Sequence, residues 1–298
     1  DEYDVPLENA YFRGFYNQMI DFVRSLFESA LKTNDSLEFA VITGCLRISR
    51  ESIFTGLNNL EVISVLNENY SEYYGFTESE VKEMLRTYGL EEKLQEVKQW
   101  YDGYLFGNTE VYNPWSVINY VKNGISGSRS FPQPYWSNTS SNSIVRELID
   151  HADLHVKKEI EELIAGGTIE KPVHEDITYE DIHKTQDNLW NFLFFTGYLK
   201  KTDERFEVDT SYLTMTIPNE EVRFIYRNNI KEWFENKLKN TDLNVLYNAV
   251  LNGNCTVFEE QVNNQLAETI SYYDYAESYY HGFLCGLLKG CNRYSNDF

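Results

Sequence analysis

The sequence predicts a fold that is mostly helical with minor β content. Residues 8–31 carry apolar side chains at helical spacing, from Phe12 to Ala30. A capping box, Thr77 to Glu80, precedes a second apolar stripe. Residues 187–240 alternate helix, hairpin and helix. At 298 residues, the chain is long enough for about two domains of roughly 100–200 residues each.

The N-terminal region predicts a βαβ arrangement. Asp1 and Glu2 form an acidic pair of the kind that follows a strand, and residues 8–31 predict one long amphipathic helix. The short apolar run of residues 39–42 predicts a buried strand that ends at Thr43-Gly44. Strand end, helix and strand follow one another as in a doubly wound sheet.

The rest of the chain predicts helices with one hairpin. Residues 60–120 are mostly helical, 123–143 form a loop rich in Gly, Ser, Asn and Pro, and helices resume at 143–155 and 157–165. Strands at 198–201 and 212–217 flank a polar turn near Asp203-Glu204, and a helix starts at Pro218. This order is typical of a winged-helix module. Residues 243–268 and 274–289 predict further helices.

Charge and cysteine content restrict the function. The net charge of −21 repels phosphate backbones, which argues against nucleic acid as a partner of this chain alone. The four cysteines match no zinc spacing and fit a reducing, cytoplasmic environment. No apolar run is long enough to span a membrane. We expect either self-association or a protein partner.

Asp1, Glu2, Thr43 and Arg47 are the candidate catalytic residues. In P-loop ATPases, an Asp at a strand end holds the Mg²⁺ shell and the following Glu polarises the attacking water, so Asp1 is also the candidate metal ligand. Thr43 ends the next predicted strand, where a polar side chain can contact the γ-phosphate, and Arg47 can stabilise the transferring phosphoryl group. The alternatives are a solvated acidic terminus, a turn cap at Thr43 and surface ion pairs at Arg47.

Several ordered blocks resemble the bacterial AAA-ATPase-like family. The resemblance covers most of residues 1–240 and rests on long motifs. These motifs are Asp1-Glu2-Tyr3-Asp4-Val5-Pro6-Leu7, Thr43-Gly44-Cys45-Leu46-Arg47-Ile48, residues 52–59, Tyr101-Asp102-Gly103-Tyr104, Tyr112-Asn113-Pro114-Trp115-Ser116, Tyr135-Trp136 with Thr139-Ser140, and Ile217-Pro218-Asn219-Glu220-Glu221-Val222.

The resemblance implies a domain order. Residues 1–60 resemble the C-terminal portion of a P-loop α/β ATPase domain, 61–186 a helical extension, 187–240 the winged-helix-like module, and 241–298 the helical start of a nuclease-like domain. In that nuclease-like segment, Glu277 resembles a residue of the first nuclease helix. The PD-(D/E)XK strands that would complete a metal site do not occur in this sequence.

The resemblance also implies ATP and Mg²⁺ as cofactors of a full-length relative. The phosphate-binding pattern GxxxxGK[ST] does not occur in this chain, so we expect neither cofactor to bind tightly to it and no ATP hydrolysis by it alone. A full-length relative would couple ATP hydrolysis to the nuclease-like domain. The alternative function is a non-enzymatic protein-interaction module that contains a winged-helix region.

Overall fold

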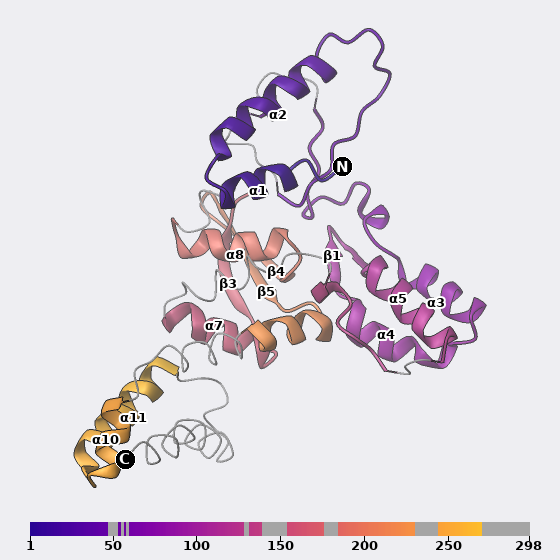
Figure 1. Ribbon diagram of the computed structural model, residues 1–298. Helices are drawn as coiled ribbons and strands as arrows, with labels where there is room; N and C mark the ends of the chain where they lie inside the picture. The colour runs from indigo at the N-terminus through magenta and orange to yellow at the C-terminus, as the bar shows by residue number, and fades with distance from the viewer. Residues whose placement is uncertain are drawn as a thin grey trace. The chain divides into compact units, whose positions relative to one another are not determined.

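The computed structural model describes residues 1–46, 53–54, 57, 60–127, 131–138, 154–175, 184–229 and 244–269 (Figure 1). The chain divides into two compact units. The first is Asp1–Ser140 with Thr168–Arg223, and the second is Ser141–Gly167 with Phe224–Phe298. Helices dominate and the strands are few, which confirms the prediction of a mostly α fold with minor β content.

The first unit opens with two helices where the sequence predicted one. Helix α1 spans Val5–Phe12 and begins with a proline in its first turn, and α2 spans Tyr16–Leu31. Gly14 between them has a φ of 77°, in the left-handed region that ends helices and that residues with a Cβ rarely adopt. The prediction of a single helix over 8–31 is therefore wrong, because Gly14 breaks it.

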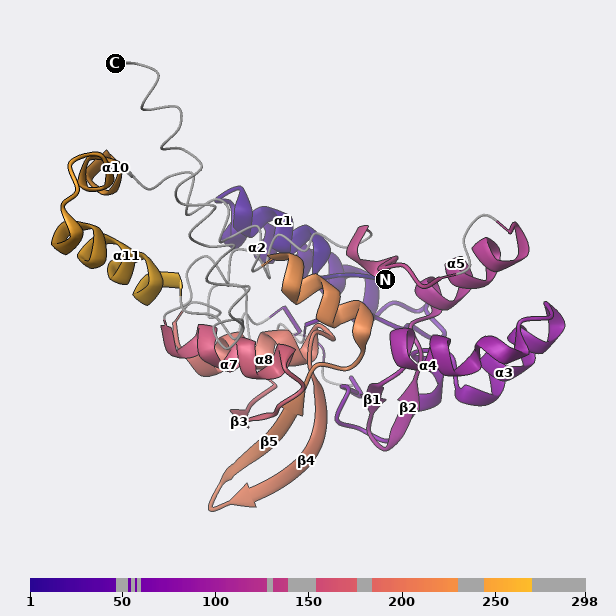
Figure 2. The same cartoon turned by 90° about the horizontal axis from the view of Figure 1, so that it is seen from below.

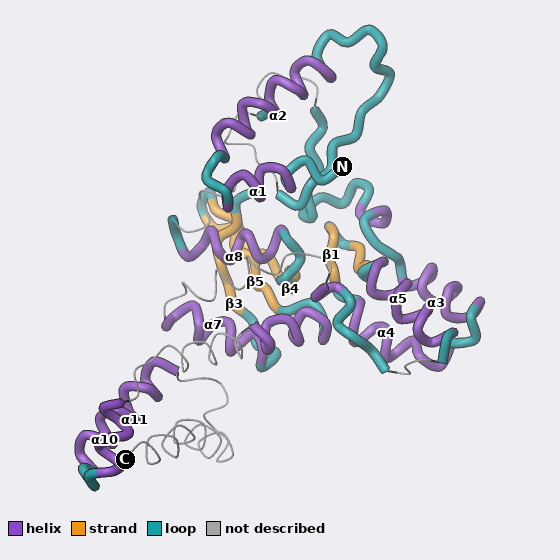
Figure 3. The backbone as a smooth tube through the Cα atoms, viewed as in Figure 1, coloured by secondary structure: helices purple, strands orange, loops and turns teal. Residues whose placement is uncertain are grey.

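The predicted strand at residues 39–42 is also wrong. The segment after α2 is an irregular loop, drawn in teal in Figure 3. Phe39 and Val41 are 80% and 67% exposed. A strand needs a neighbour to receive its backbone hydrogen bonds, and no strand pairs with this run within the described residues. Apolar composition alone therefore does not produce a strand here.

Three helices and a small hairpin form the next part of the unit. They are α3 (Glu78–Thr87), α4 (Leu94–Tyr101) and α5 (Pro114–Ile125), with β1 (Tyr104–Phe106) paired to β2 (Thr109–Val111), and short 3-10 turns η1 (Ser71–Tyr73), η2 (Glu91–Lys93) and η3 (Trp136–Asn138). The predicted capping box is confirmed at the start of α3, since Thr77 and Glu80 hydrogen-bond each other's backbone N–H.

A core of apolar and tyrosine side chains holds these helices together. Burying each large side chain contributes about 1.5–3 kcal/mol, so this core is the main source of local stability. Its buried members come from α3, α4, α5 and the end of the hairpin: Val81, Leu85, Val97, Tyr101, Tyr112, Val117, Tyr120 and Val121.

The rest of the first unit is a three-stranded antiparallel sheet with a helix. Strands β3 (Ile169–Val173), β5 (Thr210–Thr216) and β4 (Lys200–Glu207) lie in the order β3-β5-β4, as Figure 2 shows. Helix α8 (Gln186–Phe195) packs on β3, and another helix begins at Glu220. The predicted order of helix, hairpin and helix is present, and β3 is an additional strand that the sequence did not indicate.

The hairpin turn lies further along the chain than predicted. It falls at Val208-Asp209, and Asp203 and Glu204 are within β4. The prediction near Asp203-Glu204 is wrong because β4 is an edge strand with exposed side chains. Charged residues can occupy such a strand without being desolvated, and they commonly discourage pairing with another chain.

The second unit is helical in its described residues. It contains α7 (Leu154–Ile164), α10 (Asn244–Leu251) and α11 (Cys255–Thr269). Helices α10 and α11 pack against each other, and Leu246 and Ala249 are buried on α10. The predicted helix over 243–268 is split at Gly253, whose φ is 66°. The predicted helix at 274–289 lies outside the described residues.

Candidate functional site

The structure brings together three of the four candidate catalytic residues. The Thr43 hydroxyl donates a hydrogen bond to Oδ1 of Asp1, and the Glu2 backbone N–H donates to the same Thr43 oxygen at 3.3 Å. The Tyr3 backbone N–H donates to the Thr43 carbonyl at 3.0 Å. We call Asp1, Glu2 and Thr43 the acidic site. All three are exposed, and Arg47 lies outside the described residues.

Tyr3 and Asp4 hold the acidic site against the turn at residues 43–46. The Tyr3 hydroxyl donates to the Leu46 carbonyl at 2.6 Å, and the Tyr3 ring packs edge-on against Phe54 with centroids 5.3 Å apart. Oδ2 of Asp4 accepts from the backbone N–H groups of Cys45 at 2.9 Å and Leu46 at 3.1 Å. These contacts join segments about forty residues apart in the sequence.

Asp4 is a residue whose role the sequence did not reveal. Its side chain is only 1% exposed, and Oδ1 is buried without a hydrogen-bond partner among the described residues. Desolvation by burial raises the pKa of Asp4, and the two backbone hydrogen bonds oppose that rise. The sequence gives a partial indication, because Asp4 comes shortly after the acidic pair. Its burial, however, depends on the turn at residues 43–46 that packs over it.

Gly44 allows the two segments to approach. A Cβ on Gly44 would lie 2.6 Å from Cε1 of Tyr3 and 2.7 Å from Oδ1 of Asp4. Such distances are shorter than van der Waals contact, so a larger residue would separate the turn from the acidic residues.

The acidic site fits only part of an Mg²⁺–ATP site. Mg²⁺ in nucleotide sites takes one or two carboxylates and completes its shell with phosphate oxygens and water, and Asp1 offers such a carboxylate beside a hydroxyl. The phosphate-binding pattern is not in this sequence. The described residues also contain no cluster of three or more His, Cys, Asp or Glu side chains that could hold a metal ion by themselves.

A second group of polar residues is buried where four sequence motifs meet. We call it the motif cluster; it comprises residues 101–104, 112–116, 133–136 and 217–222. Its centre is Glu221, whose side chain is 0% exposed. The Ser116 hydroxyl lies 2.9 Å from Oε1 and 2.8 Å from Oε2 of Glu221, and the Trp136 backbone N–H donates to Oε1 at 2.8 Å.

Further contacts tie the four segments to one another. The Asn113 N–H donates to the Tyr101 carbonyl at 2.9 Å, and the Tyr101 hydroxyl exchanges hydrogen bonds with the backbone of Gln133. Asn219 caps the helix that begins at Glu220 by accepting from the Val222 N–H at 3.0 Å, and it donates to the Asp102 carbonyl at 2.8 Å. The motifs thus form one connected structure.

Burial raises the pKa of Glu221. Desolvation raises its pKa from 4.5 to about 7, although hydrogen bonds from the Trp136 backbone and the Ser116 hydroxyl favour the ionised form. A serine has one hydroxyl hydrogen, yet Ser116 contacts both carboxyl oxygens. A proton on Glu221 would let Ser116 accept the second hydrogen bond, so the two contacts are compatible with the neutral acid.

The two sites differ in access. Glu221 is fully enclosed, so it is a structural group and no substrate reaches it. The acidic site is exposed to solvent. Its residues were proposed from the sequence, whereas nothing in the Asn219-Glu220-Glu221 run distinguished the buried glutamate from its neighbours.

Comparisons with known proteins find a family match for the first part of the chain. Residues 1–54 match the family model of the AAA-ATPase-like family, described as a predicted AAA-ATPase. A stretch of 153 residues is 33% identical to an uncharacterized protein encoded in the vnfD 5' region of Azotobacter chroococcum mcd 1. That match covers 50% of this chain and 28% of the relative, so the chain spans well under half of the relative's length.

No solved structure matches the chain. Within the part of the chain that the structure describes, no helix is long and apolar enough to cross a membrane. The matched residues 1–54 contain all of the acidic site and the Asp4 contacts that support it. Through this segment the chain is similar to predicted AAA-ATPases.

Proposed function

We propose that the acidic site is the metal and water side of an ATP-hydrolysing centre, in a protein related to AAA-type P-loop ATPases. With Mg²⁺ and ATP bound, Asp1 would hold the Mg²⁺ shell and Glu2 would polarise the attacking water, while the Thr43 hydroxyl would fix the Asp1 carboxylate. Arg47 is the proposed group that stabilises charge on the transferring phosphoryl group. The phosphate-binding loop has to come from sequence other than these 298 residues.

The contact between Thr43 and Asp1 carries this proposal. Thr43 is predicted as a site residue because it ends the apolar run at residues 39–42. That run is not a strand, but the Thr43 hydroxyl contacts Asp1 and the Glu2 backbone. A solvated acidic terminus would not need such a partner from a distant segment. The family match to residues 1–54 supports the same assignment.

The test uses the longest protein that the gene encodes, together with the 298-residue chain. The Glu2→Gln substitution keeps the size of the side chain but removes the group that polarises water. We expect turnover in the long protein to fall by at least about 100-fold while Mg²⁺–ATP binding persists. Glu83→Gln on the exposed face of α3 is the matched control and should leave turnover unchanged.

The 298-residue chain by itself should neither bind Mg²⁺–ATP tightly nor hydrolyse it. Turnover by this chain alone would overturn the requirement for an external phosphate-binding loop. Unchanged turnover in the long Glu2→Gln variant would overturn the assignment of the acidic site.

The winged-helix region is proposed as a structural or protein-binding element. The order β3-β5-β4, with α8 before the β4–β5 hairpin, supports a winged-helix arrangement. In a DNA-binding winged helix, the helix before the hairpin exposes a recognition face. Here residues 188–194 of α8 are buried in succession. Strand β4 carries three acidic and three basic residues, so it presents no basic face. A protein partner is therefore the better candidate.

The nuclease-like domain belongs to the same proposal. We infer that longer relatives join the ATPase region to a nuclease-like domain, and that Glu277 of this chain belongs to the first helix of such a domain. That residue lies outside the described part of the chain, and the greater length of the relative leaves room for such a domain. Mg²⁺-dependent DNA cleavage by the long protein, lost in Glu277→Gln, is the expected result; cleavage that is insensitive to this change would overturn the assignment.

A further inference from the structure

A surface outside both sites presents several tyrosines on a rigid support. The segment of residues 64–76 packs on the β1–β2 hairpin. The Gly107 N–H donates to the Val65 carbonyl at 2.8 Å, and the Ser71 and Thr109 hydroxyls are 2.8 Å apart. Phe76 pairs with Tyr112 through two backbone hydrogen bonds. The segment is irregular in conformation but held at both ends.

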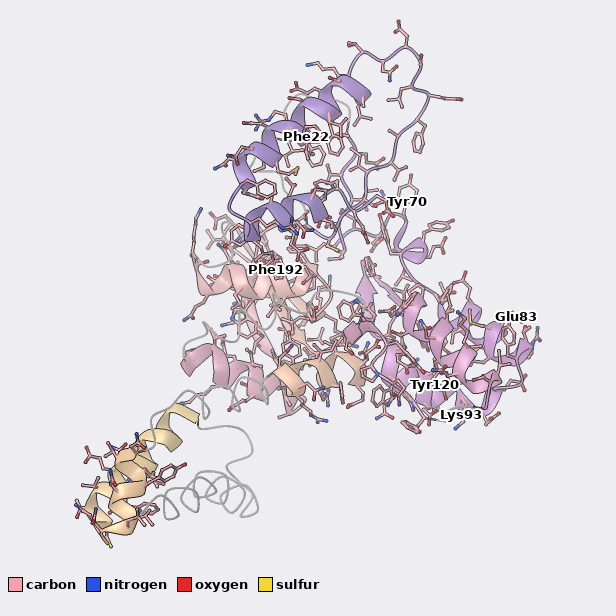
Figure 4. All side chains as sticks on the ribbon, viewed as in Figure 1. Phe22, Tyr70, Glu83, Lys93, Tyr120 and Phe192 are labelled. Atoms are coloured by element: carbon pink, nitrogen blue, oxygen red, sulfur yellow. The ribbon has the colours of Figure 1, made fainter. Side chains whose placement is uncertain are left out.

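Three aromatic side chains project from this segment. Tyr70, Tyr73 and Tyr74 are 57%, 76% and 47% exposed. The Tyr74 ring stacks on Phe106 with centroids 5.1 Å apart and planes 8° from parallel. Tyr70, labelled in Figure 4, has a φ of 61°, a left-handed conformation that costs a residue with a Cβ about 1 kcal/mol or more. The surrounding contacts therefore fix the chain in the conformation that displays these rings.

The stretch of sequence that carries these rings has charges of a single sign. Residues 51–81 contain no Lys, Arg or His, and they include six glutamates. Glu68 and Glu72 flank Tyr70 and are exposed. Within the described part of the chain, neither carboxylate forms an ion pair, and Glu68 accepts a hydrogen bond from Asn108. Exposed tyrosine faces and carboxylates are both attractive to cations.

We propose that Tyr70, Tyr73, Glu68 and Glu72 form a docking surface for a basic segment of another protein, rich in arginine or lysine. A guanidinium group can lie over a tyrosine face while it pairs with a neighbouring carboxylate. The net charge of −21 also attracts such a partner during diffusion and repels nucleic acid. A second copy of this chain would bring the same acidic surface and is disfavoured by like-charge repulsion.

The test is titration of the 298-residue chain with a fluorescent peptide of alternating Arg and Gly at near-physiological salt. We expect saturable binding that weakens by about tenfold in Tyr70→Ala/Tyr73→Ala, because two cation–π contacts are lost. The single variant Tyr73→Ala, which leaves the left-handed position untouched, should show part of this loss. Tyr70→Phe/Tyr73→Phe keeps the ring faces and should bind as the unaltered chain does.

The matched control is Tyr88→Ala, which removes a tyrosine of similar exposure, 53%, at the end of α3. It should not change peptide affinity. Glu68→Gln/Glu72→Gln should weaken binding and reduce its dependence on salt. The proposal would be overturned if the peptide showed no saturable binding, or if Tyr88→Ala weakened binding as much as Tyr70→Ala/Tyr73→Ala. Unchanged affinity in Tyr70→Ala/Tyr73→Ala would also overturn it, because the peptide would then be attracted only by diffuse negative charge.

Discussion

The motif cluster and the acidic site are both built from acidic residues that meet a hydroxyl from a distant segment, but their surroundings are opposite. In the motif cluster, Ser116 meets a fully buried Glu221, and protein groups supply the hydrogen bonds to the carboxyl. In the acidic site, Thr43 meets an exposed Asp1, and the remaining capacity of the carboxylate faces solvent. A closed carboxyl stabilises a fold, and an open one is available for a ligand.

The two sites also show that a sequence motif can mark either a structural contact in the interior or an exposed candidate site. The motifs at 101–104, 112–116 and 217–222 form long, specific blocks, and their side chains contact one another in the interior. The Asp1-Glu2 pair is uninformative as a dipeptide, yet it lies where chemistry is accessible. The more distinctive sequence blocks thus serve mainly to assemble the structure.

The largest expected effect is the loss of the Glu221 side chain. Glu221→Ala leaves the Ser116 hydroxyl and the Trp136 N–H buried without an acceptor and opens a cavity, so the free energy of unfolding should fall by about 3–5 kcal/mol. Urea unfolding followed by tryptophan fluorescence measures this change. Glu83→Gln on the exposed face of α3 is the control. A Glu221→Ala variant as stable as the unaltered chain would show that the cluster is not closed.

The pH dependence of stability follows from the same carboxyl. The folded pKa of Glu221, about 7, lies above its ordinary value of 4.5, so the folded state binds the proton more tightly. The stabilisation that comes from proton binding at Glu221 is fully present below pH 4.5 and is lost as the pH rises through 7. Between pH 5 and 7 this loss should lower the free energy of unfolding by about 2 kcal/mol. Burial raises the pKa of Asp4 and Asp102 as well, which gives the same sign.

Glu221→Gln isolates this effect. Glutamine resembles the protonated acid in shape, can accept from Trp136 and can donate to Ser116, so the variant should fold and should show a flatter profile between pH 5 and 7. The measurement is urea unfolding at several pH values for both proteins. Identical slopes would mean that Glu221 does not titrate in this range.

A substitution at Gly103 tests the close approach between the motifs at 101–104 and 217–222. It has a φ of 96°, and a Cβ there would lie 2.4 Å from the Pro218 carbonyl oxygen. Gly103→Ala should therefore lower the free energy of unfolding by about 2–3 kcal/mol, from backbone strain and from the displaced carbonyl. Gly127→Ala is the matched control, since Gly127 has a φ of 64° with no atom within 4 Å of the Cβ position, and it should cost only about 1 kcal/mol. Equal losses would show that contact with Pro218 is unimportant.

Local patterns were predictable from the sequence, and long-range partners were not. The Thr77–Glu80 capping box depends on residues three apart, and the structure contains it as predicted. The burial of Glu221 depends on Ser116, 105 residues away, and no periodicity marks it. The apolar run at 39–42 fails as a strand because a strand also requires a partner, which its own pattern cannot supply.

The candidate site shows the same division. The residue types of Asp1, Glu2 and Thr43 and the elements predicted before them indicate this site. The structure places the three residues in contact, although the strand predicted before Thr43 is absent. Their roles in catalysis stay predictions. Asp4 was missed because its importance comes from the turn that covers it, and that packing is visible only in three dimensions.

The smallest expected effect concerns Asp4, and it tests whether the acidic site depends on the closed arrangement beside it. Asp4→Ala removes the acceptor for the Cys45 and Leu46 N–H groups, so the free energy of unfolding should fall by about 1–2 kcal/mol. Those two amides should exchange with solvent faster, as measured by hydrogen exchange. Asp4→Asn keeps an acceptor oxygen and should retain most of the protection. If Asp4→Ala left both amides protected, Tyr3 and Gly44 would suffice to hold the turn, and the acidic site would not depend on the buried Asp4 carboxyl.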